Sequence, residues 1–268
     1  MPTADLDGRK LSYVRRGTGP PLLLVQGMAA HHRLWGEQLL SALETDFDIV
    51  AFDHRGVGDS DEVAGDFTVV DLVDDAVALL DRLGWADAHI LGFSLGGMVA
   101  QELVLRYPER VRTLILASTY AGGEGTDLSA PGAMTMLQAM QTGDVEVALR
   151  AAFAANLSAT YVADESHYAP FRQVSLSVPV RVPTIIAQAR AGFFHNARDR
   201  LPTITVATLI LHGTDDQIIS FPNGQQLHDL IPGSRLHTFG SVGHLFWWER
   251  PNETVALIRE HCLASRLG

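Results

Sequence analysis

The sequence lacks the residues on which several protein classes depend. Its 268 residues include a single cysteine, Cys262, so an internal disulfide cannot form. Lysine also occurs once, at Lys10, which disfavours Schiff-base chemistry. The 20 basic residues are outnumbered by 31 acidic residues, which gives a formal charge of −11. A chain of this charge offers no basic surface for phosphates or anionic lipids, so we expect neither a nucleic-acid nor a membrane partner.

The sequence also has no long apolar run. None of its apolar runs approaches the ~20 residues needed to cross a bilayer. The first five residues, Met1-Pro2-Thr3-Ala4-Asp5, are polar and acidic and lack the apolar segment of a secretory signal. Because 47% of the residues are hydrophobic, the chain can still bury a full core. We therefore predict a cytoplasmic protein. The sequence carries no signal for its oligomeric state.

Common cofactor motifs are missing as well. The sequence has no G-x-G-x-x-G after an expected strand and no G-x-x-x-x-G-K-[ST], which argues against dinucleotide and phosphate-loop sites. Its 11 histidines do not occur at metal-binding spacings such as H-x-x-x-H or H-x-H. We predict that the protein uses neither a metal nor an organic cofactor.

What the sequence does contain is an alternation of short apolar runs with amphipathic segments. Apolar residues recur with a 3.6-residue period over 67–83 and again over 95–107, which predicts helices. The short runs predict strands that are buried on both faces, as in a parallel sheet; they occupy residues 22–25, 48–52, 88–91, 111–117 and 206–211. We expect the segment 11–15 to pair antiparallel at one edge of this sheet.

The alternation stops between Tyr120 and Pro202. About 80 residues here carry helical patterns, notably over 134–140 and 145–157, and no clear strand. An insertion of this length is too long for a simple loop, and long insertions often serve as lids. The pattern predicts a helical cap over one end of the sheet.

The strongest chemical motif is Gly92-Phe93-Ser94-Leu95-Gly96. It matches G-x-S-x-G directly after an expected strand and at the start of an expected helix. Glycines two residues before and after the serine let the strand and helix approach closely, and the tight turn holds the serine hydroxyl out at the end of the sheet. Ser94 is therefore the candidate nucleophile.

A serine nucleophile needs a base that works near neutral pH, which points to histidine. His244 ends the loop Gly240-Ser241-Val242-Gly243-His244, which follows an expected strand over 236–239. Chemistry in α/β sheets gathers at such loops, beyond the carboxyl ends of the strands. We therefore select His244 as the base.

The third member is an acid that orients the histidine and stabilises its charged form. Asp215 and Asp216 both follow the expected strand over 206–211. Either one gives the chain order serine, acid, histidine, which is typical of α/β-hydrolases. Spacing alone does not separate these two neighbours.

With these motifs the chain resembles the α/β-hydrolase family, specifically its lid-bearing serine esterases and lactonases. The segment 213–219, GTDDQII, is similar to the family's G-x-x-D-x-x-[IV] acid loop, which implies Asp216 as the acid. Gly243-His244, with Glu249 and Pro251 downstream, resembles the family's histidine segment.

The resemblance extends to other parts of the chain. Residues 53–60, DHRGVGDS, resemble the family's D-x-R-G-x-G-x-S loop, which implies a structural role for this loop. The family fold implies a mostly parallel eight-stranded sheet flanked by helices, with a helical cap inserted after strand 6. We therefore expect a core made of residues 1–120 and 203–268 and a cap made of residues 121–202.

The resemblance also implies an oxyanion hole and a set of substrate contacts. The two backbone N–H donors of the oxyanion hole would be Met28, after Gly27, and Leu95, after the nucleophile. The family usually has His-Gly before the first donor, whereas this chain has Gln26-Gly27. Because the donors are backbone groups, this departure concerns only how the loop is held. We expect Met28, Leu95 and Leu245 to contact the substrate.

These observations predict a serine hydrolase that cleaves a carboxylic ester with a small to medium, largely apolar acyl group. Three alternatives stay open: hydrolysis of an enol-lactone or another lactone, carbon–carbon bond hydrolysis or cofactor-free perhydrolysis on the same triad, and ligand binding without turnover. One scaffold hosts all of these functions. The sequence does not identify the substrate within these classes.

Overall fold

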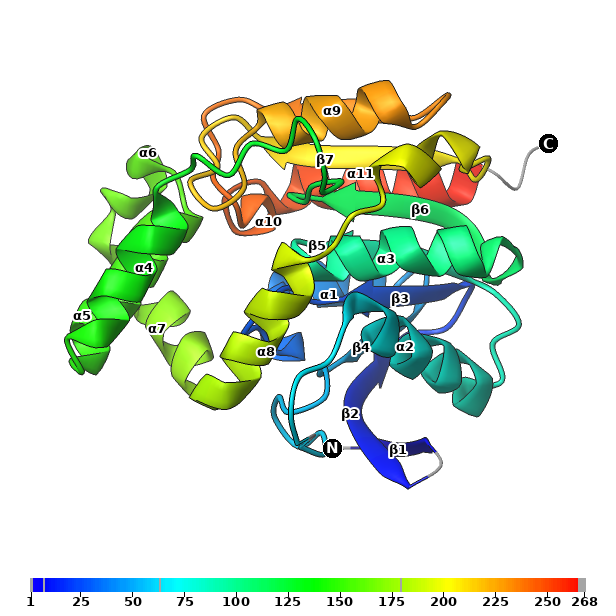
Figure 1. The fold of residues 1–268 in the computed structure, drawn as a ribbon, viewed down its shortest axis with the longest axis horizontal. Coiled ribbons are helices and arrows are strands. Elements are labelled where there is room, and N and C mark those ends of the chain that lie inside the picture. The colour runs from blue at the N-terminus through cyan, green and yellow to red at the C-terminus, as the bar shows by residue number, and fades with distance from the viewer. Residues whose placement is uncertain (1, 7, 63, 179, 265–268) are drawn as a thin grey trace.

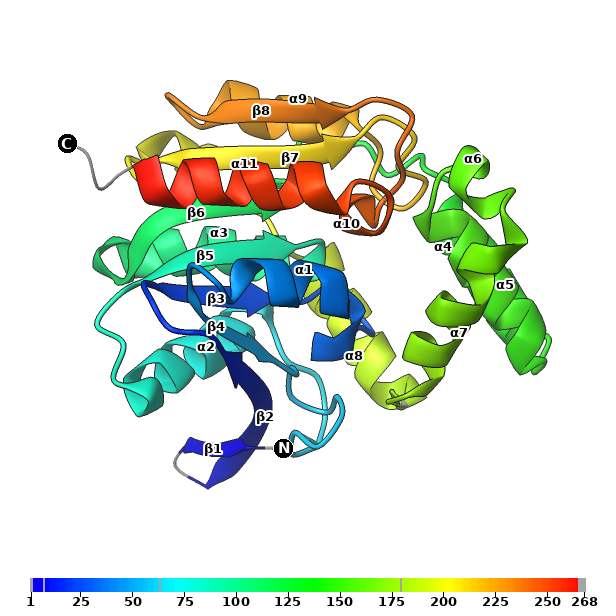
Figure 2. The ribbon, with the colours of Figure 1, turned by 180° about the vertical axis from the view of Figure 1, so that it is seen from behind.

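The fold is described from a computed structural model over residues 2–6, 8–62, 64–178 and 180–264. One eight-stranded sheet crosses the molecule in the order β1-β2-β4-β3-β5-β6-β7-β8, with helices on both of its faces (Figures 1 and 2). Its strands are β1 (Thr3–Leu6), β2 (Arg9–Arg16), β3 (Pro21–Val25), β4 (Asp48–Phe52), β5 (Ala88–Phe93), β6 (Val111–Ala117), β7 (Thr208–Gly213) and β8 (Arg235–Phe239). The predicted mostly parallel eight-stranded sheet flanked by helices is confirmed.

The two ends of the sheet differ in strand direction. Strands β3 to β8 run parallel, whereas β2 pairs antiparallel with β4. The antiparallel pairing expected for residues 11–15 is therefore confirmed, but their position at the edge is wrong. Strand β1 pairs with the other side of β2 and forms the edge. The sequence pattern misses β1 because it is a short strand in which only Ala4 is buried.

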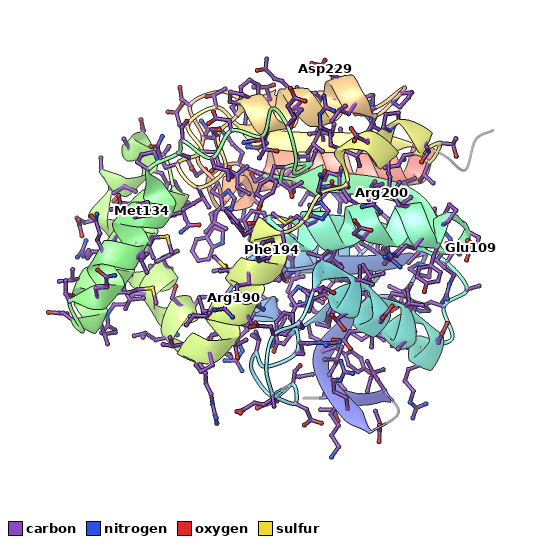
Figure 3. The ribbon with its side chains drawn as sticks, in the orientation of Figure 1. Glu109, Met134, Arg190, Phe194, Arg200 and Asp229 are labelled. Atoms are coloured by element: carbon purple, nitrogen blue, oxygen red, sulfur yellow. The ribbon has the colours of Figure 1, made fainter. Side chains whose placement is uncertain are left out.

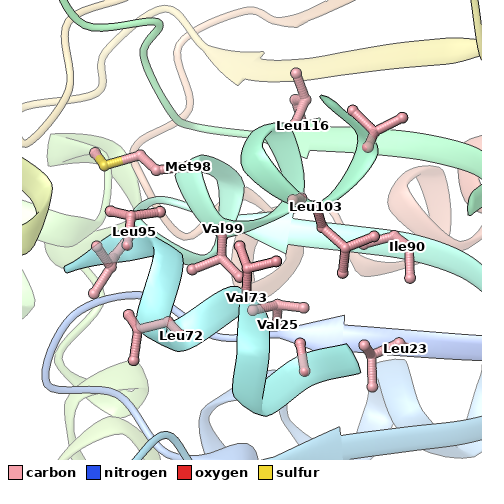
Figure 4. Close-up of a cluster of buried hydrophobic side chains, with 14 of the residues drawn as sticks. Leu23, Val25, Leu72, Val73, Ile90, Leu95, Met98, Val99, Leu103 and Leu116 are labelled. Atoms are coloured by element: carbon pink, nitrogen blue, oxygen red, sulfur yellow. The ribbon is translucent and has the colours of Figure 1, made fainter. Parts of the chain in front are cut away.

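The central strands are buried on both faces because alternate side chains pack into two separate layers. Leu23 and Val25 of β3 pack in one layer against α2 and α3, and Figure 4 shows this cluster. Leu22 and Leu24 point the other way, into a layer formed with α1 and α11. The helices of the two layers are α2 (Val69–Leu83), α3 (Leu95–Arg106) and α9 (Pro222–Leu230) on one face, and α1 (Glu37–Leu43), α10 (Phe246–Glu249) and α11 (Pro251–Ala264) on the other.

Local sequence signals account for the ends of α2. The Thr68 hydroxyl accepts a hydrogen bond from Asp71 N–H, and the Asp71 carboxylate accepts one from Thr68 N–H, which forms a capping box. Gly84 ends the helix with φ +71°, a left-handed conformation that glycine adopts without a steric penalty. The amphipathic pattern is thus confirmed as a helix with defined ends.

Residues 121–202, called the helical insertion below, lie between β6 and β7. Helices α4 to α7 stand beyond the arrowheads of the central strands, and α8 returns toward the sheet (Figures 1 and 2). The patterns over 134–140 and 145–157 correspond to α4 and α5, whereas no clear pattern in the sequence predicts α6, α7 or α8. The bounds are α4 (Gly132–Gln141), α5 (Val145–Asn156), α6 (Ala159–Val162), α7 (Tyr168–Leu176) and α8 (Val182–Phe193).

The described residues also form four short 3-10 helices: η1 (His32–Trp35), η2 (Pro108–Arg110), η3 (Glu165–His167) and η4 (Arg198–Thr203). No helix within the described residues combines the length and apolar character needed to cross a membrane.

Candidate active site

Ser94 occupies a strained turn between β5 and α3. Its backbone has φ +54° and ψ −118°, a region that L-residues rarely adopt. The Ser94 N–H donates to the Ala117 carbonyl at 2.9 Å, which ties the turn to the neighbouring strand. The side chain is half-buried and the residue stands at the carboxyl end of a central strand. Strain held in place by surrounding structure is typical of functional sites.

The flanking glycines are explained by close backbone contacts. A Cβ on Gly92 would lie 2.2 Å from the Gly96 carbonyl oxygen, and one on Gly96 would lie 2.1 Å from the Val25 carbonyl oxygen. Any larger residue at either position would push β5, α3 or β3 apart. The G-x-S-x-G spacing is therefore what allows the helix to start directly over the sheet.

His244 and Asp216 meet at the ends of two other strands. His244 Nδ1 lies 2.6 Å from Asp216 Oδ2, and both side chains are almost fully buried. The other carboxylate oxygen of Asp216 accepts hydrogen bonds from the N–H groups of Ile218 and Ile219, each at 2.9 Å. The acid is therefore held by backbone donors on one side and contacts the imidazole on the other.

The environment of Asp216 favours its charged form. Burial alone would raise the pKa of Asp216, but the His244 charge and hydrogen bonds from His212 and His244 outweigh it and lower the pKa below its usual range. The carboxylate is therefore ionised at neutral pH and can stabilise a positive charge on His244.

His212 is a neighbour of the acid that the sequence analysis did not single out. Its Nε2 lies 2.8 Å from the Ile219 carbonyl oxygen and 3.3 Å from Asp216 Oδ2. Because the Ile219 oxygen can only accept, Nε2 carries the proton. The sequence signal for this residue is its place at the end of β7, four residues before the acid.

Asp215 points elsewhere. It is exposed and accepts a hydrogen bond from the Thr214 hydroxyl at 2.9 Å. Of the two neighbouring acids, the structure therefore brings Asp216 to His244.

The rest of the His244 environment places the imidazole near the Ser94 turn. The ring centroids of Phe93 and His244 are 4.6 Å apart, and Phe93 directly precedes Ser94. With Nδ1 occupied by Asp216, Nε2 is the nitrogen left to face a serine. Within the described residues Ser94 Oγ makes no hydrogen bond, so its contact with His244 stays a prediction. Such hydrogen bonds are often long in substrate-free enzymes and tighten when substrate binds.

The loop after β3 leaves one backbone donor unbonded. The Gly27 N–H donates to the Gln26 side-chain oxygen at 3.0 Å, and the Ala29 N–H donates to Gln188 Oε1 at 2.8 Å. The Ala30 N–H reaches the Gly27 carbonyl at 3.4 Å. In the part of the chain that the structure describes, only the Met28 N–H of these four has no acceptor.

This unbonded donor belongs to a loop that lies against Ser94. A Cβ on Gly27 would lie 3.1 Å from Ser94 Cβ. Leu95 is the first residue of α3, so its N–H has no acceptor within the helix. Two backbone donors are expected at an oxyanion hole. Of these, the Met28 N–H has no acceptor among the described residues, and the Leu95 N–H has none within its own helix.

Gln26 takes over the support of this loop. Its side chain is fully buried, and its carboxamide oxygen holds the next residue's N–H. Its own carbonyl accepts a hydrogen bond from His54 Nε2 at 2.9 Å. The departure from the family's usual His-Gly therefore leaves an ordered loop.

The three predicted substrate contacts differ in accessibility. The Met28 side chain is 43% exposed, whereas Leu95 and Leu245 are buried. Contact of these residues with a substrate stays a prediction.

The loop that contains Asp53 and Arg55 is tied to neighbouring elements of the fold. Asp53 is fully buried, accepts the His32 N–H at 2.7 Å and lies 3.0 Å from His32 Nδ1. Arg55 Nε donates to the Asp75 carboxylate of α2 at 2.6 Å. These contacts link the loop to η1 and α2 rather than to Ser94.

One cavity lies away from these residues. It has a volume of about 550 Å³ and lies between α2, α3 and the end of α8; its lining includes Phe67, Glu102, Arg190, Phe194 and Arg200. Figure 3 labels three of these residues, Arg190, Phe194 and Arg200. Across the described ranges, no group of three or more His, Cys, Asp or Glu side chains is arranged to hold a metal ion.

Comparison with known proteins places the chain in a family. The family model for the alpha/beta hydrolase fold matches residues 20–251. The poly(3-hydroxyalkanoate) depolymerase of Ectopseudomonas oleovorans is 28% identical over 270 residues, which cover 98% of this chain and 93% of the relative.

Solved structures show the same likeness. The esterase RhEst1 from Rhodococcus sp. ECU1013 is 27% identical, with a TM-score of 0.83 and coverage of 99% of this chain and 98% of that one. Est816, described as an N-acyl homoserine lactone degrading enzyme, is 30% identical, with a TM-score of 0.80 and coverage of 96% and 99%.

Proposed function

This chain belongs to the α/β-hydrolase fold family, and on that premise we propose that it hydrolyses carboxylic esters with small to medium, largely apolar acyl groups. Ser94 is the nucleophile, His244 the general base and Asp216 the acid that orients it. The observation that carries the proposal is the buried Asp216–His244 hydrogen bond of 2.6 Å beside the strained Ser94 turn. The likeness to the esterase RhEst1 supports the same reaction class.

The first half of the reaction forms an acyl-enzyme. Ser94 Oγ attacks the ester carbonyl carbon while His244 Nε2 takes the hydroxyl proton. The carbonyl oxygen becomes an oxyanion and accepts hydrogen bonds from the Met28 and Leu95 N–H groups. When the carbon–oxygen bond to the alcohol breaks, His244 returns its proton to the leaving oxygen.

The second half repeats these steps with water. His244 takes a proton from the water as its oxygen attacks the acyl carbon, and the same oxyanion hole stabilises the intermediate. Collapse of the intermediate breaks the bond to Ser94, which recovers its proton from His244. The ionised Asp216 stabilises the imidazolium in both halves.

The helical insertion acts as a cap over this site, and the described residues within 1–120 and 203–268 form the core. Its contacts with the histidine loop support this role. The Leu245 N–H donates to the Asn156 carbonyl at 2.9 Å. Glu249 Oε1 accepts the N–H groups of both Ser158 and Gly243 at 2.9 Å, so one carboxylate joins the insertion to the residue before His244.

Lactone hydrolysis is a second candidate, favoured by the likeness to Est816. The same residues would perform it, because a lactone is a cyclic ester whose leaving alcohol stays attached to the acyl group. The two candidates differ only in the shape of the substrate that the cap admits.

The deciding experiment measures hydrolysis of nitrophenyl esters from acetyl to dodecanoyl, together with simple and N-acyl homoserine lactones. Ser94→Ala is the control and is expected to lower kcat ~10⁵- to 10⁶-fold without loss of folding. Ester turnover that needs Ser94 supports the first candidate, and turnover of lactones alone supports the second. Turnover of neither substrate class by the wild type would overturn the proposal in favour of carbon–carbon hydrolysis, perhydrolysis or ligand binding.

A further inference from the structure

Helix α8 of the helical insertion touches the loop that carries the proposed oxyanion donor. Gln188, in the middle of α8, is fully buried although its side chain is polar. Its Oε1 accepts a hydrogen bond from the Ala29 N–H at 2.8 Å. The contact joins residues 159 positions apart in the chain, next to Met28.

Ala29 needs such a contact because of its backbone conformation. Its φ of +55° lies in the left-handed region, which costs a residue that has a Cβ. The hydrogen bond to Gln188 fixes the peptide plane that follows Met28. The orientation of the Met28 N–H depends on this local geometry, and an oxyanion donor acts well only when it is held in place before the reaction.

Gln188 can hold the loop because α8 is itself anchored. A Cβ on Gly192, one turn further along α8, would lie 3.5 Å from side-chain atoms of both Leu95 and Met98 of α3. The Tyr120 hydroxyl donates to the Gly192 carbonyl at 2.9 Å. Helix α8 therefore stands in a defined position relative to both proposed oxyanion donors.

The orientation of the Gln188 amide is set by this one contact. A flipped amide would place its NH₂ group against the Ala29 N–H, so the oxygen must face Ala29. In this orientation Nε2 is buried and has no protein partner within the described residues. A site that served packing alone would be better filled by an apolar side chain, because a buried donor without a partner is costly.

We propose that Gln188 is a positioning residue that holds the oxyanion loop through Ala29, so that the helical insertion sets the placement of the Met28 donor. This inference rests on the proposed serine hydrolase function. It assigns to the insertion a part in transition-state stabilisation in addition to covering the site.

The test compares Gln188→Met with Gln101→Met. Gln101, on α3, is also fully buried, and its Nε2 donates to the Tyr120 carbonyl at 3.0 Å. Both substitutions remove a buried amide and keep the side-chain length. We expect Gln188→Met to lower kcat ~10-fold with KM changed less than about twofold, because a misplaced donor weakens only transition-state binding.

Inhibition by an alkyl boronic acid supplies a readout that general destabilisation would not move. The boronate forms a tetrahedral adduct with Ser94 and places an oxygen in the oxyanion hole. Its inhibition constant should rise in parallel with the loss of kcat in Gln188→Met and change less than about twofold in Gln101→Met. Gln188→Asn keeps the amide but is one methylene shorter, so it should show a comparable loss of kcat and of boronate inhibition. This variant decides the question if Gln188→Met does not fold.

The outcomes separate the two proposals. Unchanged kcat and boronate inhibition in a folded Gln188 variant overturn the positioning role, as does an equal loss of both in Gln101→Met. If the wild type neither turns over esters and lactones nor reacts at Ser94 with a fluorophosphonate, the proposed function itself fails.

Discussion

The sheet and the helical insertion place their apolar side chains differently. In the sheet, Leu22, Leu23 and Leu24 of β3 are all fully buried, and alternate residues enter opposite layers. In the insertion, Met134 of α4 is 58% exposed and Phe194 at the end of α8 is 79% exposed. Single exposed apolar side chains are ordinary, whereas a contiguous patch of them often marks a binding surface. The comparison indicates that the sheet stabilises the fold and positions the site residues, whereas the insertion presents exposed apolar side chains.

Substitution of the site residues at the carboxyl ends of the strands should lower kcat more than it lowers the stability of the fold. Asp216→Asn is expected to lower kcat ~10⁴-fold, because an amide can no longer fix the tautomer of His244 or stabilise its charge. Asp215→Asn, a matched change in the neighbouring exposed residue, should stay within about threefold of wild type. Kinetics on whichever ester the wild type prefers would check both, and a larger effect of Asp215→Asn would reassign the acid.

The packing difference between the two regions predicts a difference in unfolding free energy. Leu23→Ala should lower it by about 3 kcal/mol, because it leaves a cavity between β3 and the α2–α3 layer. Met134→Ser should change it by less than about 0.5 kcal/mol, because this side chain is mostly in water already. Urea unfolding of both variants measures the two values. Equal losses would show that α4 contributes to the core as much as β3 does.

The junction between the regions should make stability depend on pH. His195 lies in the insertion against Glu102 of α3, 3.8 Å from its carboxylate. Burial lowers the pKa of His195 from 6.5 to about 4, against the opposing effect of Glu102. Below pH 6.5 His195 therefore binds a proton in the unfolded chain but not in the folded chain. The free energy of unfolding falls as the pH drops toward 4.

This effect is isolated by His195→Gln, which has no ionisable group at this position. The difference between these two pKa values corresponds to at most about 3 kcal/mol at pH 4. The loss of unfolding free energy between pH 7 and 4.5 should thus be smaller in the variant by roughly 2 kcal/mol. Parallel pH profiles of the two proteins, measured by urea unfolding, would contradict the assignment.

The smallest expected effect is that of a chelator. The proposed reaction uses protein groups and water alone, so incubation with EDTA followed by gel filtration should leave kcat within about 20% of the untreated enzyme. Loss of activity that added Zn²⁺ or Mn²⁺ restores would contradict the prediction that no metal takes part.

Much of the sheet could be predicted because its signals are local. A run such as residues 22–25, apolar throughout and followed by Gln26-Gly27, predicts a buried strand without reference to the rest of the chain. The edge strand β1 could not be found this way, since its pairing with β2 depends on backbone hydrogen bonds rather than on apolar side chains. The short helices α6 and α7 were missed for a similar reason, because too few residues repeat in them to establish a period.

The candidate site divides along the same line. By itself, the sequence determined the Ser94 turn, because the close contacts at Gly92 and Gly96 arise between neighbouring elements. It also narrowed the acid to two neighbours and placed the histidine in a loop. The family resemblance implied Asp216 rather than Asp215, and the tertiary structure shows that Asp216 meets His244. Only the tertiary structure shows that His212 supports the acid and that Gln188 reaches Ala29. These contacts join residues whose side-chain directions depend on how separate strands and helices pack, and no local pattern in the chain encodes that packing.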